Sequence, residues 1–146
     1  MAITQAIANA FKKQLLEGDA NFKSSGGDVF KLALYTSSAT LNSATTSFTT
    51  SGEVSNTGTY ASGGDPLAGQ NTSIASGVAI VDFADLSFTG VTLTARGALI
   101  YNTSSAVTNA AVAVLDFGAD KTATSGTFTI QFPAFTTAAA ILRISG

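Results

Sequence analysis

The feature that most constrains this chain is the alternation of apolar and polar residues through much of its length. Within residues 29–35, Phe30, Leu32 and Leu34 fall on one side and Lys31 on the other. A period of two matches a β-strand, whose successive side chains point to opposite faces. We therefore predict a strand over 29–35 and look for the same pattern downstream.

Further strands are predicted by β-branched and alternating apolar runs that are separated by Gly, Ser, Thr and Asn. Short strands at this spacing are typical of an antiparallel β-sandwich or a jelly-roll-like barrel, so the predicted fold class is mainly β. The expected strands cover 77–83, 91–102 with an irregularity at Gly97, 110–117, 127–132 and 139–144, with turns at 102–108 and 118–126.

The one predicted helix covers residues 3–17, where apolar side chains recur at every fourth position. Gly18 follows where a C-terminal glycine cap belongs. The apolar stripe predicts that the helix packs on its own domain or on a neighbouring protein. The stripe consists of Ile3, Ile7, Phe11 and Leu15.

Residues 36–70 are rich in Ser, Thr and Gly and hold few large apolar side chains. We expect a long loop or arm with short strands near 47–49 and 52–55, and a loop over 58–69. Structureless loops of this length are uncommon in compact domains and are often functional. The predicted organisation is one domain over 1–146, with a β body over 28–146.

Composition excludes several kinds of site. The chain has no Cys and no His, so disulfides, thiolate metal sites and histidine-activated nucleophiles are absent. The seven Lys and Arg residues are scattered and the net charge is -2, which is unlike a nucleic-acid binder. No apolar run reaches the roughly 18 residues of a membrane helix. Lys12 and Lys13 follow the apolar residues at the start, the reverse of a signal peptide, so we expect synthesis in the cytoplasm.

The low charge of the chain has a direct consequence for its surface. Charged residues make up 11% and the mean hydropathy is +0.33, against roughly 25% charged residues in an average domain. A free monomer with so few charges has little to keep it soluble. We expect much of its surface to be covered in the working state; the alternative is an ordinary β domain with a bland surface.

No motif predicts catalysis, so we expect no enzyme, no cofactor and no small-molecule substrate. The Asp-Phe-Gly triplet at 116–118 lacks every other kinase motif. No local pattern marks a pair of catalytic carboxylates. Four aspartates offer oxygen ligands for calcium, but their spacing matches no calcium loop. They are Asp82, Asp85, Asp116 and Asp120.

Two arginines and three tyrosines are candidates for contact with a partner. Arg96 and Arg143 interrupt apolar strands; each either faces solvent or forms an ion pair at a subunit interface, where Arg is enriched. The tyrosines either form a weak sugar-stacking platform or lie at the edge of the core or at an interface, with their hydroxyls in water. They are Tyr35, Tyr60 and Tyr101.

Several stretches resemble small virion structural proteins of tailed bacteriophages. The resemblance extends over nearly the whole chain but rests on general patterns, without catalytic signatures. It lies in residues 2–18 (AITQAIANAFKKQLLEG), 30–36 (FKLALYT), 94–101 (TARGALIY), 113–118 (AVLDFG) and 128–133 (FTIQFP).

This resemblance implies a capsid decoration or cement protein, or alternatively a tail or head–tail component. The implied partners are the major capsid protein and further copies of the chain, and the implied location is the virion. A host-adhesion or carbohydrate-binding module is the alternative from another class. The interface candidates are Ile3, Ile7, Phe11, Leu15, Tyr60, Arg96 and Arg143.

Overall fold

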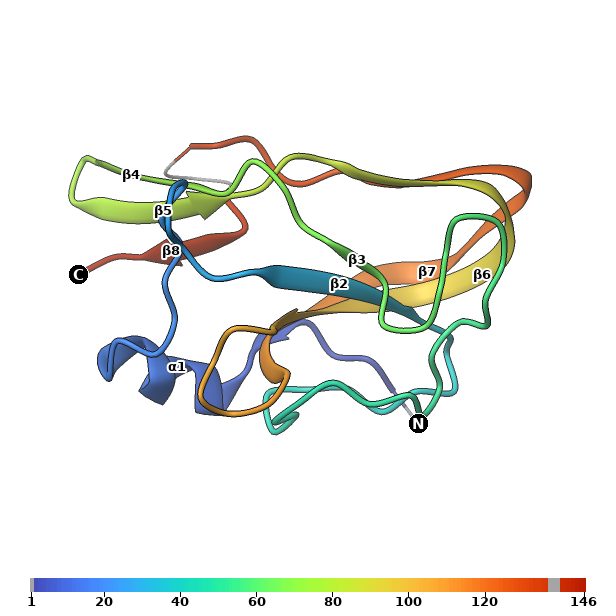
Figure 1. Ribbon diagram of the computed structural model, residues 1–146, viewed down its shortest axis with the longest axis horizontal. Coiled ribbons are helices and arrows are strands. Elements are labelled where there is room, and N and C mark those ends of the chain that lie inside the picture. The colour runs from blue at the N-terminus through green and yellow to red at the C-terminus, as the bar shows by residue number, and fades with distance from the viewer. Residues whose placement is uncertain (1, 137–139) are drawn as a thin grey trace.

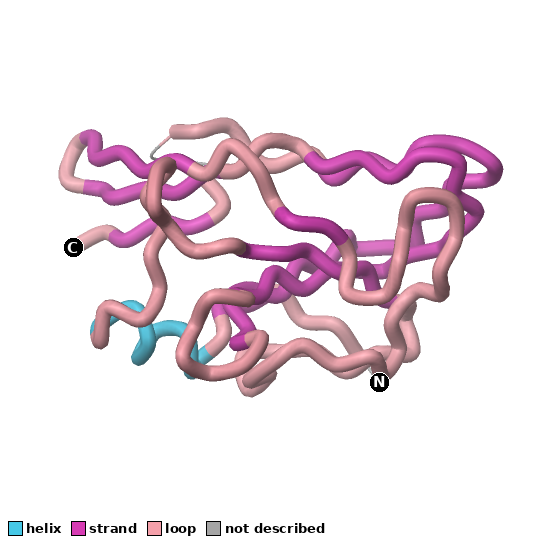
Figure 2. Tube along the Cα trace, viewed as in Figure 1, coloured by secondary structure: helices cyan, strands magenta, loops and turns pink. Residues whose placement is uncertain are grey.

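The computed structural model describes residues 2–136 and 140–146. Figures 1 and 2 show a mainly β molecule with one short helix near the N-terminus. A five-stranded antiparallel sheet has the order β1-β7-β6-β2-β3, and a three-stranded antiparallel sheet has the order β4-β5-β8. The predicted fold class is confirmed, since two antiparallel sheets with one N-terminal helix are consistent with a β-sandwich.

The strands are short except for two that form one long ribbon. No helix in the described part of the chain is long and apolar enough to span a membrane. The elements are β1 (Ala6–Ile7), α1 (Asn9–Leu16), β2 (Phe30–Tyr35), β3 (Asp65–Pro66), β4 (Asn71–Ala75), β5 (Val78–Asp82), β6 (Leu86–Asn102), β7 (Ala110–Ile130) and β8 (Leu142–Ile144).

The ribbon of β6 and β7 belongs to the five-stranded sheet and bends sharply at the end of the molecule away from β4, β5 and β8 (Figure 1). Its register shifts between Ala95 and Gly97, which confirms the predicted irregularity. Gly97 is required there, because a Cβ would lie 2.4 Å from the carbonyl oxygen of Leu115. The predicted turn at 118–126 is wrong, because these residues belong to β7 and do not separate two strands. The pairing of β7 with β6 is bulged there but continues. The hydroxyls of Thr94 and Thr122 form a hydrogen bond of 2.9 Å across it.

The helix is shorter than predicted, because residues 3–7 pair with other segments instead of coiling. Ile3 forms a bridge with Leu41, and β1 adds to the edge of β7. Edge pairing satisfies backbone groups of β7 and outweighs a weak helical preference. The glycine cap is confirmed: Gly18 has φ 75°, and the N–H groups of residues 18 and 19 donate to carbonyls of the last turn.

The segment 36–70 packs on the five-stranded sheet and is not a free arm. Its apolar side chains Leu41, Val54 and Tyr60 are buried in the core. The short strands expected near 47–49 and 52–55 are reduced to single bridges. A few apolar residues spaced along a polar segment are enough to anchor it by burial. The low apolar content of 36–70 had instead favoured the prediction of a free arm.

Of the remaining strands, β2 and β5 match the predictions closely. The alternation at 127–132 is confirmed, since Phe128, Ile130 and Phe132 are buried and the residues between them are exposed. The last strand appears as β8, and residue 139 of the prediction lies outside the described residues. Strand β4 was missed because all five of its residues are exposed and carry no apolar alternation.

A row of aromatic rings joins the helix to the core. Phe22 stacks on Phe30 with ring centroids 4.4 Å apart and meets Phe11 of α1 edge to face at 5.9 Å. Phe83, which follows β5, contacts Phe30 at 5.8 Å and Phe132 at 5.8 Å. Such pairs contribute about 0.5–1.5 kcal/mol each beyond area burial. This row fixes the position of α1 relative to the second sheet.

Candidate interaction surface

Two residues, the buried Tyr60 and the carboxylate of Glu53, hold the loop that covers the five-stranded sheet in place. Tyr60 donates its hydroxyl to Glu53 Oε1 over 2.8 Å and accepts the backbone N–H of Leu34 at 2.9 Å. The carboxylate of Glu53 also accepts the hydroxyl of Ser62 and the backbone N–H of Gly63. Glu53 therefore ties together three residues of the loop that covers the sheet.

Tyr35, Tyr60 and Tyr101 are all buried, and we call them the tyrosine cluster. The hydroxyls of Tyr35 and Tyr101 donate to the backbone carbonyls of Thr49 and Gly63, both over 2.6 Å. The sugar-stacking alternative is therefore wrong, and so is the expectation of hydroxyls in water. Burial raises the pKa of all three phenols, that of Tyr101 to about 12.

Arg96, a candidate for an ion pair at a subunit contact, forms an ion pair with Asp116 of its own chain. Its Nε lies 3.1 Å from Asp116 Oδ1, across the β6–β7 ribbon. The N–H of Gly118 and the guanidinium of Arg96 hold the pKa of Asp116 below its ordinary value. Both side chains are about one third exposed or less, so this pair is a modest clamp at the bulge of β7.

The aspartates considered as calcium ligands do not converge. Among the described residues, no three acidic side chains lie together as a metal site requires. Asp85 accepts the backbone N–H of Phe132, and Asp116 is occupied by Arg96 and Gly118. Each of these two carboxylates thus has a local structural partner.

The most exposed apolar surface lies at the end of the molecule where α1 faces the three-stranded sheet. A groove of about 770 Å³ runs there, with α1 and residues 18–23 on one side and β4, β5 and β8 on the other. We call it the α1–β8 groove. Its apolar lining consists of Ile7, Phe11, Leu15, Leu16, Ala20, Phe22, Ala79, Ile80, Val81, Leu142 and Ile144.

An apolar row across the three-stranded sheet extends the groove outward. Ile74, Ala79 and Ile144 are paired in register, so their side chains share one face. Ile74 is 73% exposed and Ile144 is 58% exposed, and Leu16 on the helix is 90% exposed. Three large aliphatic side chains thus stand in solvent at one end of a chain with few charges.

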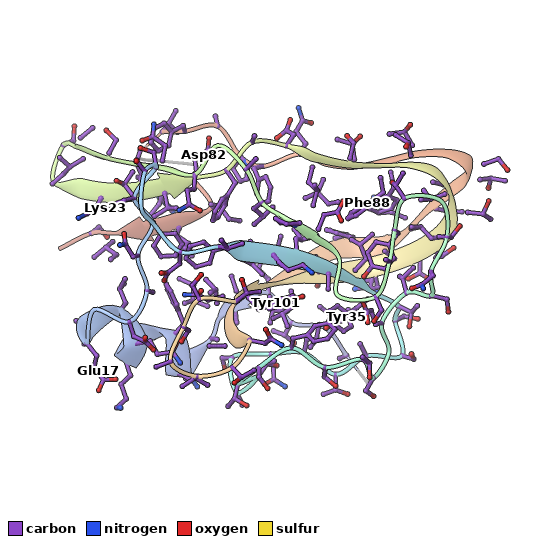
Figure 3. All side chains as sticks on the ribbon, in the orientation of Figure 1. Glu17, Lys23, Tyr35, Asp82, Phe88 and Tyr101 are labelled. Atoms are coloured by element: carbon purple, nitrogen blue, oxygen red, sulfur yellow. The ribbon has the colours of Figure 1, made fainter. Side chains whose placement is uncertain are left out.

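Charge is distributed unevenly around the groove. Its lining includes Lys12, Lys23 and Arg143, three of the seven basic residues. None of the nine acidic residues lines it, and all nine lie in the described part of the chain. The nearby Glu17 is paired with Lys13 at 3.0 Å. Figure 3 shows Lys23 at this end and Tyr35 and Tyr101 in the middle of the molecule.

The structure separates the interface candidates into two groups. Ile3 and Tyr60 are at most 7% exposed and serve the core of the chain itself, so they offer a partner little surface, and Arg96 is paired with Asp116 away from the groove lining. Ile7, Phe11, Leu15 and Arg143 line the groove. Sequence reasoning missed Lys12, Lys23, Leu16 and Ile144; the one available signal was Leu16, an apolar residue off the predicted stripe.

Comparison with known proteins gives no relative: no protein-family model, no curated protein and no solved structure matches this chain.

Proposed function

We propose that this chain is a non-enzymatic virion structural protein that decorates the outer surface of a major capsid lattice and stabilises it. The observation that carries the proposal is the exposed apolar end formed by Leu16, Ile74 and Ile144. Apolar patches on an otherwise polar surface mark sites of protein association. The chain is made in the host cytoplasm and works in the virion, beside further copies of itself.

The rest of the molecule suits this role. A decoration protein needs a rigid body and a contact surface that is repeated by the symmetry of the particle. The tyrosine cluster and the packed segment 36–70 supply rigidity. Modest contacts repeated over a lattice supply holding power through multivalency. Ser and Thr side chains, which cover much of the surface, hydrogen-bond across an interface without the desolvation cost of charges.

The test is co-sedimentation of the purified protein with expanded capsids that lack it, scored by gel and electron microscopy. We expect saturable binding at a fixed ratio to the major capsid protein. The double variant Leu16→Ser with Ile144→Ser should bind capsids at least about tenfold more weakly than the wild type, because it removes exposed apolar anchors. The matched control is Val107→Ser, which removes a side chain that is 48% exposed and does not line the groove.

Absence of saturable binding would overturn the decoration role. Detection of the protein in isolated tails, together with that result, would assign it to the tail or the head–tail junction instead. Equal binding by the double variant and the wild type would show that the apolar end is not the contact surface.

A further inference from the structure

We propose that the α1–β8 groove binds a peptide segment of a partner protein that combines aliphatic side chains with carboxylates. This inference deepens the proposed function and rests on it for the identity of the partner as a virion protein.

The groove suits a peptide in size and chemistry. Its volume of about 770 Å³ lies in the range of sites that enclose a ligand. Phe11, Leu15 and Phe22 form one wall, and Val81 and Leu142 form the other. These walls favour aliphatic side chains, which release water when they are buried.

The edge of the second sheet also lines the groove. Strand β8 is last in the order β4-β5-β8. Leu142, Arg143 and Ile144 all contact the groove, although successive side chains of a strand point to opposite faces. Strand β8 is thus an edge strand that lines the groove, and an extended peptide can add a strand to such an edge.

Charge decides which peptide fits. Lys12 and Lys23 line the groove beside its apolar residues, and no acidic side chain of the described residues lines it. The Lys12 ammonium donates to the neutral side-chain amide of Asn9 over 3.2 Å, a partner that carries no countercharge. A segment carrying Asp or Glu beside its aliphatic residues would meet these cations, and complementary charge selects the partner and speeds encounter.

The same charges argue against a second copy of the chain as the occupant. In a two-fold contact, each patch meets its own equivalent. The two lysines of one copy would then face the two lysines of the other, and none of the nine acidic residues lines either groove. Like charges placed together oppose such an interface.

The experiment measures binding of two synthetic heptapeptides to the purified protein by calorimetry at low ionic strength. One is acetyl-Asp-Leu-Glu-Leu-Asp-Leu-Glu-amide, and the other carries Lys in place of every acid. We expect the acidic peptide to bind and the basic peptide not to bind. Added salt should weaken the binding, because exposed charges are screened.

Charge reversal provides the decisive variant. Lys12→Glu with Lys23→Glu should weaken the acidic peptide about tenfold and allow the basic peptide to bind. The control is Lys13→Glu with Lys121→Glu, which changes two exposed lysines outside the groove lining. Each pair takes the net charge from -2 to -6, since every Lys→Glu change contributes -2. The control should bind the acidic peptide within twofold of the wild type.

Several outcomes would overturn the inference: no binding of the acidic peptide, equal binding of both peptides, or equal weakening by the control pair. Dimerisation of the wild type in sedimentation velocity that is lost on Leu16→Glu would assign the groove to a second copy. These results are distinct from the capsid assay. Peptide binding with the expected charge preference, but without capsid binding, would leave the groove chemistry standing and remove only the decoration role.

Discussion

The tyrosine cluster and the α1–β8 groove differ in how far they expose large side chains to solvent. At the cluster, large side chains are sealed from water and each hydroxyl has a partner in the protein. At the groove, large aliphatic side chains such as Leu16 stand in solvent. The difference indicates which surface the fold needs for its own stability and which remains available for contact.

The largest expected effect is alkaline unfolding driven by the tyrosine cluster. Its phenols have a folded-state pKa above the ordinary value of about 10. Their contribution to stability is complete below about pH 10 and is lost as the pH rises through the folded pKa, about 12 for Tyr101. Tyrosinate absorbance and circular dichroism should therefore change together, in one steep transition. Absorbance rising near pH 10 with the fold intact would show that the cluster is open.

The next effect in size is expected for Phe88→Ala. Phe88 is fully buried and meets Tyr60 edge to face at 4.9 Å. Removing its ring should lower the free energy of unfolding by about 3–5 kcal/mol, as in other buried cores. Urea denaturation measures this change. A loss below 1 kcal/mol would mean that the core around Phe88 and Tyr60 is loosely packed.

A smaller effect is expected for Tyr60→Phe, which keeps the ring and removes only the hydroxyl. The change leaves the N–H of Leu34 and an oxygen of Glu53 without that partner. We expect a loss of about 1–3 kcal/mol in the free energy of unfolding, the usual cost of a buried polar group left unpaired. Tyr101→Phe is the comparison, since it removes one hydrogen bond to a carbonyl and should cost less.

The smallest effect is expected at the groove. Leu16→Ser changes a side chain that is 90% exposed and should alter the free energy of unfolding by no more than about 0.5 kcal/mol. Thermal melting beside the wild type checks this. A substantially larger loss would show that the groove end contributes to folding after all, and the contrast between the two regions would disappear.

The parts of the fold that could be predicted depend on local pattern. Strand β2, the irregularity at Gly97 and the cap at Gly18 each follow from a few neighbouring residues. The start of the helix could not be predicted, because Ala6 pairs with Val114, more than a hundred residues away. A strand edge that needs a partner is visible only in the folded chain.

The groove was beyond sequence reasoning for the same reason. Arg143 on β8 lies more than a hundred residues from Lys12 and Lys23 in the sequence, yet all three line the same groove. Tyr60 shows the opposite case, a residue predicted for contact that the fold uses internally. Local patterns indicate that a residue is buried, but not which surface buries it.

The aromatic row from Phe11 through Phe22 to Phe30 has a consequence for recognition. Because Phe11 meets Phe22 edge to face and Phe22 stacks on Phe30, α1 is held against the core, and the width of the groove is set before any partner arrives. A binding surface that is already in shape loses little conformational entropy on association, so more of the contact energy is left as affinity. Preorganisation of this kind would let a short segment suffice as a ligand.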